Sequence, residues 1–402
     1  MYGLHRELAV VGDVIMRRQG IDILCLKLNG TEQKGVNYPC LTGGVSSGDF
    51  VLVNTTAVDL GLGSGGFHPV VANLTGVQRE AGCGPPVAGR EAKAGESDAD
   101  LSWLLAGGRG QGGIAENSLE SGPFELDGEK GTFSGHIMKM RYTPLQVRTL
   151  SVEEEECPHR EQIESFRDLQ GRPVVVLPLH SLLAPLAVVF HSFFPGGNLV
   201  YIMTGGGSLS LEFSHTVAEL KECGLLAAAV SCGQTFGGDL EAVNIFSALA
   251  AAAAVGEADM IAVGMGPGIA GTGTELGFSG TENVFSCYAA RVLGGRPFLV
   301  PRISLADGRL RHYVISHHTE TILNRLLNFK VEIVFPDHFL VRQNIEKFDW
   351  DERFDLSLFS YRLIDKILRN CDLDFRSMGR NYCNDPLFFI AGALPVVACG
   401  GL

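Results

Sequence analysis

The residues most capable of chemistry are concentrated in one segment, residues 307–319 (DGRLRHYVISHHT). This segment holds an aspartate, two arginines and three histidines, and it leads from a polar loop into a predicted helix over 319–329. An imidazole can exchange protons near neutral pH or bind a metal ion. His317 and His318 are adjacent, and a helix turns adjacent side chains to different sides, so we expect at most one of them in a site.

Other candidate acid–base residues lie elsewhere in the chain. His180 follows a predicted strand, and Asp239 and Glu241 stand at the start of a predicted helix over 240–255. Histidines with a carboxylate are suited to proton transfer or to metal binding. The catalytic candidates are therefore Asp239, Glu241, His180, His317 and His318, and the metal candidates are Asp239, His180 and His317. No H-x-x-x-H or H-x-H spacing fixes two ligands, so helix-capping carboxylates and hydrogen-bonded surface histidines are the alternatives, and no cofactor is specified.

A glycine-rich loop over 264–274 (GMGPGIAGTGT) is the best candidate for binding an anion. Gly266-x-Gly268-x-x-Gly271 has the spacing of a dinucleotide fingerprint, but no helix follows it directly and no acidic residue stands about 20 positions on. Glycine amides and threonine hydroxyls favour a phosphate or a carboxylate instead, and a purely structural loop is the alternative. The expected ligand-binding residues are Gly266, Gly268, Gly271, Thr272, Gly273, Thr274 and Asn244, joined by Lys139 and Arg141.

A parallel sheet would position most of these residues. Between residues 171 and 402, apolar runs alternate with helical stretches, which is typical of an α/β domain covered on both faces. The runs cover 174–179, 199–204, 226–231, 260–264, 298–303 and 331–335. Predicted helices cover 210–223, 240–255, 281–293, 319–329 and 354–368, and another begins at Pro386 with Asp385 as its N-cap. Ligands bind such sheets at the carboxyl ends of the strands, where the histidine and glycine segments fall.

The first part of the chain predicts a small β-barrel or sandwich domain over 1–160. Short apolar strands are expected at 8–16, 22–28 and 50–54, and Asn29-Gly30 is a hairpin signal. Residues 76–132 are rich in glycine and acidic residues, which indicates a flexible insertion. Strand-like sequence resumes at 136–140 and 146–152, so the insertion interrupts the domain. The second domain, over 171–402, is expected to be Rossmann-like with C-terminal helices.

The composition narrows the classes of partner. The 402 residues carry a net charge of −13 without a basic block, which argues against binding nucleic acid. The apolar stretches at 174–190 and 387–402 are too short or too interrupted to span a membrane, and no secretory leader is visible. The ten cysteines form no C-x-x-C motif and fit a reduced, cytoplasmic protein. Only 19% of residues are charged, which allows for a homo-oligomer interface.

The chain resembles a bacterial family catalogued as domain of unknown function 3866. The resemblance rests on blocks spread over most of the chain: 36–39 (VNYP), 54–58 (NTTAV), 61–68 (GLGSGGFH), 135–146 (GHIMKMRYTPLQ), 236–244 (FGGDLEAVN), 265–268 (MGPG), 271–274 (GTGT), 316–319 (SHHT) and 378–380 (MGR). The insertion over 76–132 looks longer than is usual in the family. The resemblance implies no reaction, although its blocks coincide with the candidate loops.

These observations favour an enzyme or sensor that binds an anionic, phosphorylated or carboxylated, small molecule at the strand ends. In this hypothesis Lys139 and Arg141 face the same cleft between the two domains. The alternative is a non-enzymatic oligomeric scaffold whose loops pack against a partner chain. A polar pocket at the strand ends would favour the first hypothesis, and an apolar surface without a pocket would favour the second.

Overall fold

A computed structural model describes residues 4–18, 21–61, 66–75, 135–348, 350 and 352–400. It divides into two compact units, Met1–Thr149 and Leu150–Leu402. The predicted insertion over 76–132 lies outside the described residues.

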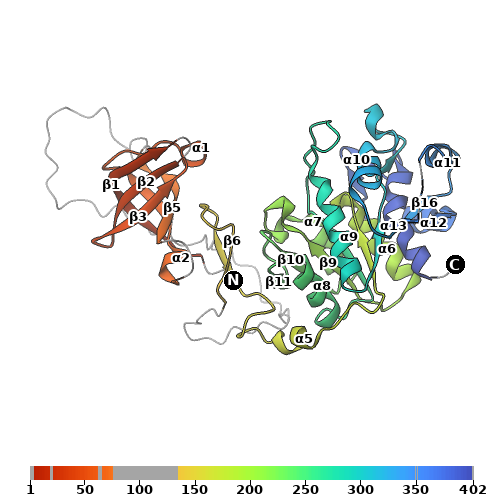
Figure 1. Ribbon diagram of the computed structural model, residues 1–402, viewed down its shortest axis with the longest axis horizontal. Coiled ribbons are helices and arrows are strands. Elements are labelled where there is room, and N and C mark those ends of the chain that lie inside the picture. The colour runs from red at the N-terminus through yellow and green to blue at the C-terminus, as the bar shows by residue number, and fades with distance from the viewer. Residues whose placement is uncertain are drawn as a thin grey trace. The chain divides into compact units, whose positions relative to one another are not determined.

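The first unit is built on a closed five-stranded barrel with the strand order β1-β2-β3-β5-β4 (Figure 1). The strands are β1 (Arg6–Arg18), β2 (Ile21–Leu28), β3 (Thr31–Asn37), β4 (Phe50–Asn54) and β5 (Phe67–Asn73), and two single-turn helices, α1 (Pro39–Thr42) and α2 (Thr56–Asp59), lie between them. Asn29 and Gly30 have φ values of 49° and 76°, as a tight hairpin turn requires, so the predicted β2–β3 hairpin is confirmed. The barrel core is aliphatic, with Leu24, Leu26 and Val51 fully buried.

A short hairpin follows the undescribed segment and contacts the barrel. It consists of β6 (Ile137–Lys139) and β7 (Val147–Thr149), which pair antiparallel where strand-like sequence resumes. The Asn54 side chain at the end of β4 donates to the carbonyl oxygens of Pro144 and Gln146, at 3.2 and 3.0 Å. These hydrogen bonds fasten the hairpin to the end of a barrel strand.

The second unit is an α/β domain around an eight-stranded, fully parallel sheet with the order β11-β10-β9-β12-β8-β13-β16-β17 (Figure 1). Six strands confirm the six predicted apolar runs: β8 (Pro173–Val176), β9 (Leu199–Met203), β10 (Ala228–Cys232), β12 (Met260–Gly264), β13 (Arg296–Leu299) and β16 (Val331–Pro336). Their side chains are almost all buried, as both faces of a covered sheet require. The fold class predicted from the sequence is therefore correct.

Two edge strands were wrongly predicted as parts of helices. β11 (Leu240–Ala242) occupies the start of the expected helix 240–255, and the helix itself, α8 (Ile245–Ala254), begins only after Asn244. β17 (Phe354–Phe359) occupies the start of the expected helix 354–368, where α12 (Arg362–Arg369) forms only the second half. Pairing with β10 and β16 supplies backbone hydrogen bonds that a local sequence pattern does not reveal.

Helices cover both faces of the sheet. α6 (Leu183–Phe193) follows β8 and packs with α7 (His215–Glu222), α12 and α13 (Pro386–Gly400), whereas α8 packs with α9 (Glu282–Val292). The chain passes from β8 toward β9 but from β12 toward β13, in opposite directions across the sheet. Right-handed crossovers then place α6 and α9 on opposite faces. The loops after the neighbouring strands β8 and β12 therefore diverge, and such a point is where α/β sheets bind ligands.

The remaining elements complete the carboxyl side and the periphery of the domain. The short ladders are β14 (Ile303–Ser304) with β15 (Val314–Ile315), and β18 (Arg376–Ser377) with β19 (Arg380–Asn381). The further helices are α5 (Arg160–Ser165), α10 (His317–Thr321) and α11 (Phe339–Ile345), and α10 continues into a π-helical turn, Ile322–Leu326. None of the helices in the described ranges is long and apolar enough to cross a membrane.

Candidate functional site

A pocket of about 400 Å³ opens at the carboxyl ends of β8, β12 and β13. Its lining residues are Leu179, His180, Ser181, Thr216, Pro267, Gly268, Ile269, Gly271, Gly273, Arg302, Arg309, Arg311, His312, His318, Arg376, Ser377 and Met378. They include four arginines and three histidines but no aspartate or glutamate. The lining therefore carries a concentrated positive charge.

The segment after β13, which contains β14, β15 and the start of α10, brings Arg302, Arg309 and Arg311 together. β14 and β15 pair antiparallel, so the loop between them leaves the sheet edge and returns to it. Ser316 then caps α10, because its hydroxyl accepts from the backbone amide of His318 at 3.2 Å. Thr319 in the first turn accepts from the amide of Arg302 at 2.9 Å. The start of α10 is thereby held beside the end of β13.

Arg302 lies at the bottom of this cationic cluster, with its side chain only 3% exposed. Its Nη2 lies 3.4 Å from Asp307, which is also held by Arg309 through two hydrogen bonds of 2.8 and 2.9 Å. Hydrogen bonds from Arg309 keep the pKa of Asp307 far below its usual range. Burial, with the charges of Arg309 and Arg380, lowers the pKa of Arg302 to about 10, so Arg302 stays charged at neutral pH. Its Nε is buried without a hydrogen-bond partner among the described residues.

Arg311 supplies charge that no carboxylate among the described residues offsets. Within the described part of the chain it makes no ion pair, whereas Arg376 pairs with Asp374. The guanidinium of Arg311 lies near the loop after β12, since a Cβ built on Gly273 would be 3.8 Å from its Cζ. Arg311 is thus an exposed cation at the pocket wall, free to contact a ligand.

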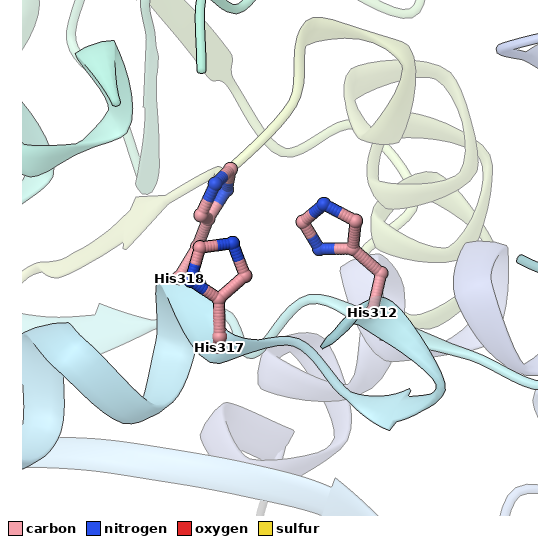
Figure 2. Close-up of side chains that lie close together, drawn as sticks. All are labelled: His312, His317 and His318. Atoms are coloured by element: carbon pink, nitrogen blue, oxygen red, sulfur yellow. The ribbon is translucent and has the colours of Figure 1, made fainter. Parts of the chain in front are cut away.

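Three histidines lie close together (Figure 2), and one of them, His318, is 3.4 Å from Arg302. His312 comes from the turn before β15, and His317 and His318 open α10. One ring nitrogen from each lies within 4.8 Å of the other two. The rings of His317 and His318 are 4.4 Å apart, so these adjacent side chains lie side by side at the entry of the helix, although only His318 of the two lines the pocket. They occupy the entry of the helix, where the chain has just turned out of β15.

The surroundings keep these rings neutral. Burial, and then the charges of Arg302 and Arg309, lower the pKa of His312 to about 4. Burial and the charge of Arg302 lower the pKa of His318 to about 3, and burial also lowers the pKa of His317. The ring of His318 stacks on Phe278 at a centroid distance of 4.0 Å. Neutral imidazoles can donate to an anion or bind a metal ion.

His180 lines the pocket with both ring nitrogens engaged. Nδ1 lies 2.9 Å from the hydroxyl of Tyr201, and Nε2 lies 2.6 Å from the hydroxyl of Ser214. Burial lowers the pKa of His180 to about 4. The ring is therefore a neutral, hydrogen-bonded part of the wall.

Three other predicted residues lie away from the pocket, beside the edge strand β11. Asp239 pairs with Lys221 and accepts from the backbone amide of Ala229 at 2.8 Å. Glu241 accepts from the amide of Gly237 at 2.6 Å. Asn244 caps α8 in a capping box instead of facing a ligand. Local backbone hydrogen bonds thus occupy all three side chains, and none of them lines the pocket.

The glycine loop contributes to the pocket in part. Gly268, Gly271 and Gly273 line it, whereas Gly266 turns at φ +82° against Met203. The hydroxyls of Thr272 and Thr274 lie 2.8 Å apart and stabilise the loop itself. Lys139, in β6, and Arg141, in the following turn, belong to the first unit, and their place in a ligand site remains a prediction.

The four arginines and His312 line the pocket but were not among the predicted site residues. For Arg302, Arg309, Arg311 and His312 the available signal was their clustering in residues 302–312, at and just after the end of a predicted strand, whereas Arg376 lies outside this cluster. His312 stands five residues before His317, a spacing that matches no ligand pattern within a single helix. The β14–β15 ladder brings them together.

Comparison with known families gives one match. The family model described as "Protein of unknown function (DUF3866)" matches residues 34–84 and 108–396. No curated protein and no solved structure gives a significant match. The matched segments cover the part of the barrel that follows residue 34 and the α/β domain, with its pocket, up to residue 396. As the sequence resemblance predicted, the chain belongs to the DUF3866 family.

Proposed function

We propose that the protein binds an anionic small molecule, phosphorylated or carboxylated, in the pocket at the carboxyl edge of its parallel sheet. One observation carries this proposal: four arginines line the pocket and no carboxylate does. Guanidinium groups match the geometry of phosphate and carboxylate oxygens and bind them through charge-assisted hydrogen bonds. Positive charge without a carboxylate lining suits an anion and opposes a free cation.

The shape and position of the pocket support the same proposal. A volume of about 400 Å³ lies in the range of small-molecule sites. The pocket lies where the loops after β8 and β12 diverge, and glycines after β12 allow a ligand to approach the backbone closely. A polar pocket at the strand ends is also the feature that favours a ligand-binding protein over an oligomeric scaffold.

Titration calorimetry with inorganic phosphate, and with citrate as a carboxylate probe, tests the proposal. The informative variant is Arg311→Gln, because Arg311 lines the pocket without a carboxylate partner among the described residues. A hydrogen bond to a charged group contributes about 1.5–3 kcal/mol, and partial exposure reduces this, so we expect the affinity to fall about fivefold or more.

Arg291→Gln is the matched control. Arg291 is an exposed arginine on α9 outside the pocket, so its replacement changes the net charge equally and should leave the affinity unchanged. Equal losses in both variants would mean that only the overall charge matters. Absence of saturable binding of either probe to the native protein would contradict the proposal directly.

A further inference from the structure

We propose that His312, His317 and His318 form a binding site for a divalent transition-metal ion, with Zn²⁺ as the best-matched ion. The inference goes beyond anion binding and is tested with the metal alone. It rests on the convergence of the three rings, on an unsatisfied nitrogen among them, and on the ligand chemistry of imidazole.

The geometry is close to that of a three-histidine centre. The three ring nitrogens lie within 4.8 Å of one another (Figure 2). Zinc–nitrogen bonds are about 2.0–2.1 Å long, so small rotations of the side chains would bring the three atoms into one tetrahedral shell. His312 and His318 also line the pocket, so a fourth position would open toward it, as in zinc sites that bind water or substrate.

The hydrogen bonds around the three rings leave one buried ring nitrogen unsatisfied within the described residues. Nε2 of His317 is buried and has no hydrogen-bond partner among the described residues. A buried polar atom without a partner is unfavourable, and a bound metal ion would satisfy it. Nδ1 of His312 lies 2.6 Å from the hydroxyl of Ser316, which orients this ring and leaves its Nε2 available. Such a second contact is typical of histidines that bind metals.

Arg302 contacts His318, so its guanidinium group would have to move away from that ring when a metal ion binds. Its Nη1 lies 3.4 Å from Nδ1 of His318, a long contact that competes for the lone pair of that ring. The guanidinium has Asp307 as an alternative partner at a similar distance. The charges of Arg302, Arg309 and Arg311 also oppose a cation, so an anionic fourth ligand is needed to offset them. Phosphate, sulfate or hydroxide would each serve.

The donor set selects the class of metal. Three imidazoles without a carboxylate suit Zn²⁺, Co²⁺, Ni²⁺ or Cu²⁺, whereas Mg²⁺ and Ca²⁺ require oxygen ligands. The other predicted metal candidates do not join the cluster, since Asp239 pairs with Lys221 and both nitrogens of His180 are hydrogen-bonded.

Equilibrium dialysis of the metal-free full-length protein against Zn²⁺, and a parallel titration with Co²⁺, test the site. The native protein should bind one equivalent, and Co²⁺ should produce the intense visible absorption of tetrahedral coordination. His317→Ala and His312→Ala should each weaken binding at least tenfold. His215→Ala, which removes an exposed histidine on α7, should bind like the native protein.

Cys223 and Cys383 call for a further control, because these two thiols are exposed in the described part of the chain and can bind zinc on their own. The experiment is therefore repeated in a Cys223→Ser, Cys383→Ser background, where the stoichiometry should persist. Loss of metal in this background, retention in both histidine variants, or no uptake by the native protein would each overturn the proposal. If His312→Ala does not fold, His317→Gln tests the site in its place, because it removes one ring of the cluster but keeps a polar side chain. Phosphate binding measured without metal reports separately on the proposed function.

Discussion

His180 should make the stability of the α/β unit depend on pH. Its ring is hydrogen-bonded to Tyr201 and Ser214, and burial lowers its pKa to about 4. In the unfolded chain a histidine titrates near ~6.5. Between these two pH values the unfolded chain binds more protons than the folded one. The free energy of unfolding must therefore decrease as the pH falls below about 6.5, until the folded ring itself protonates near pH 4.

The size of this effect follows from the two pKa values. Each unit of difference corresponds to about 1.4 kcal/mol, and by pH 5 most but not all of the difference is expressed. His180 should thus remove about 2 kcal/mol of stability between pH 7.5 and pH 5. This is a large share of the roughly 5–15 kcal/mol that stabilises a typical domain.

Urea unfolding followed by tryptophan fluorescence measures the free energy of unfolding of the α/β unit. The chain has two tryptophans, and Trp103→Phe leaves Trp350, which packs against Phe335 and Phe354 in the α/β core. In this background His180→Asn, which cannot titrate, should lose about 2 kcal/mol less than its parent between pH 7.5 and pH 5.

The exposed His215 supplies the control for this measurement. His215→Asn should retain the full pH dependence of the parent. An unchanged pH dependence in His180→Asn would refute the reasoning, because it would show that burial does not hold this ring neutral. The same conclusion would follow if His215→Asn reduced the dependence equally.

Three further predictions concern the strand ends. Gly238→Ala should destabilise the α/β unit by several kcal/mol in thermal or urea unfolding, because a Cβ there would lie 2.7 Å from the carbonyl oxygen of Ala229. In the control variant Gly308→Ala the added Cβ meets nothing within 4 Å, so this change should be nearly neutral. Asn244→Ala should cost about 1 kcal/mol in the same assay by removing the cap of α8, and no loss would mean that solvent replaces the cap fully. Sulfate that fills the arginine pocket should tighten Co²⁺ binding about fivefold or more, and Co²⁺ should tighten sulfate equally; calorimetry showing independent binding would contradict a shared site.

The sequence predicted the centre of the fold better than its edges. Central strands such as β9 and β12 are continuous apolar runs because helices cover both of their faces, and this pattern is visible without a structure. β17 alternates apolar residues with Asp355 and Ser357, as a strand at the edge of the sheet does. This alternation is itself a strand signal, which the predicted helix over 354–368 did not take into account, and the pairing with β16 confirms the strand.

The pocket lies at the carboxyl edge of the sheet, where a ligand site was predicted, and part of the glycine loop lines it. This edge could be located from the sequence because strand polarity follows from the alternation of strands and helices, but ligand binding there stays a prediction. Asp239 and Glu241 also follow a strand, but β11 lies at the outer edge of the sheet, three strands away from β12. The order of strands depends on long-range pairing, so a single sequence cannot show which strand ends are neighbours.

In the proposed function, the arginine pocket would allow a chain with a negative net charge to bind an anion. The net charge of −13 is spread over 402 residues, whereas ions in solution screen charges beyond about 8 Å at physiological ionic strength. The proposed ligand would therefore respond mainly to Arg302, Arg309 and Arg311, and among the described residues Asp307 is the carboxylate that pairs with Arg302 and Arg309. Because that carboxylate already holds Arg302 and Arg309, it orients these guanidinium groups before any ligand arrives. Guanidinium groups that are already held in place lose less conformational entropy when a ligand binds. The ion pairs with Asp307 therefore lower the net charge of the pocket, but they also orient its arginines for the proposed ligand.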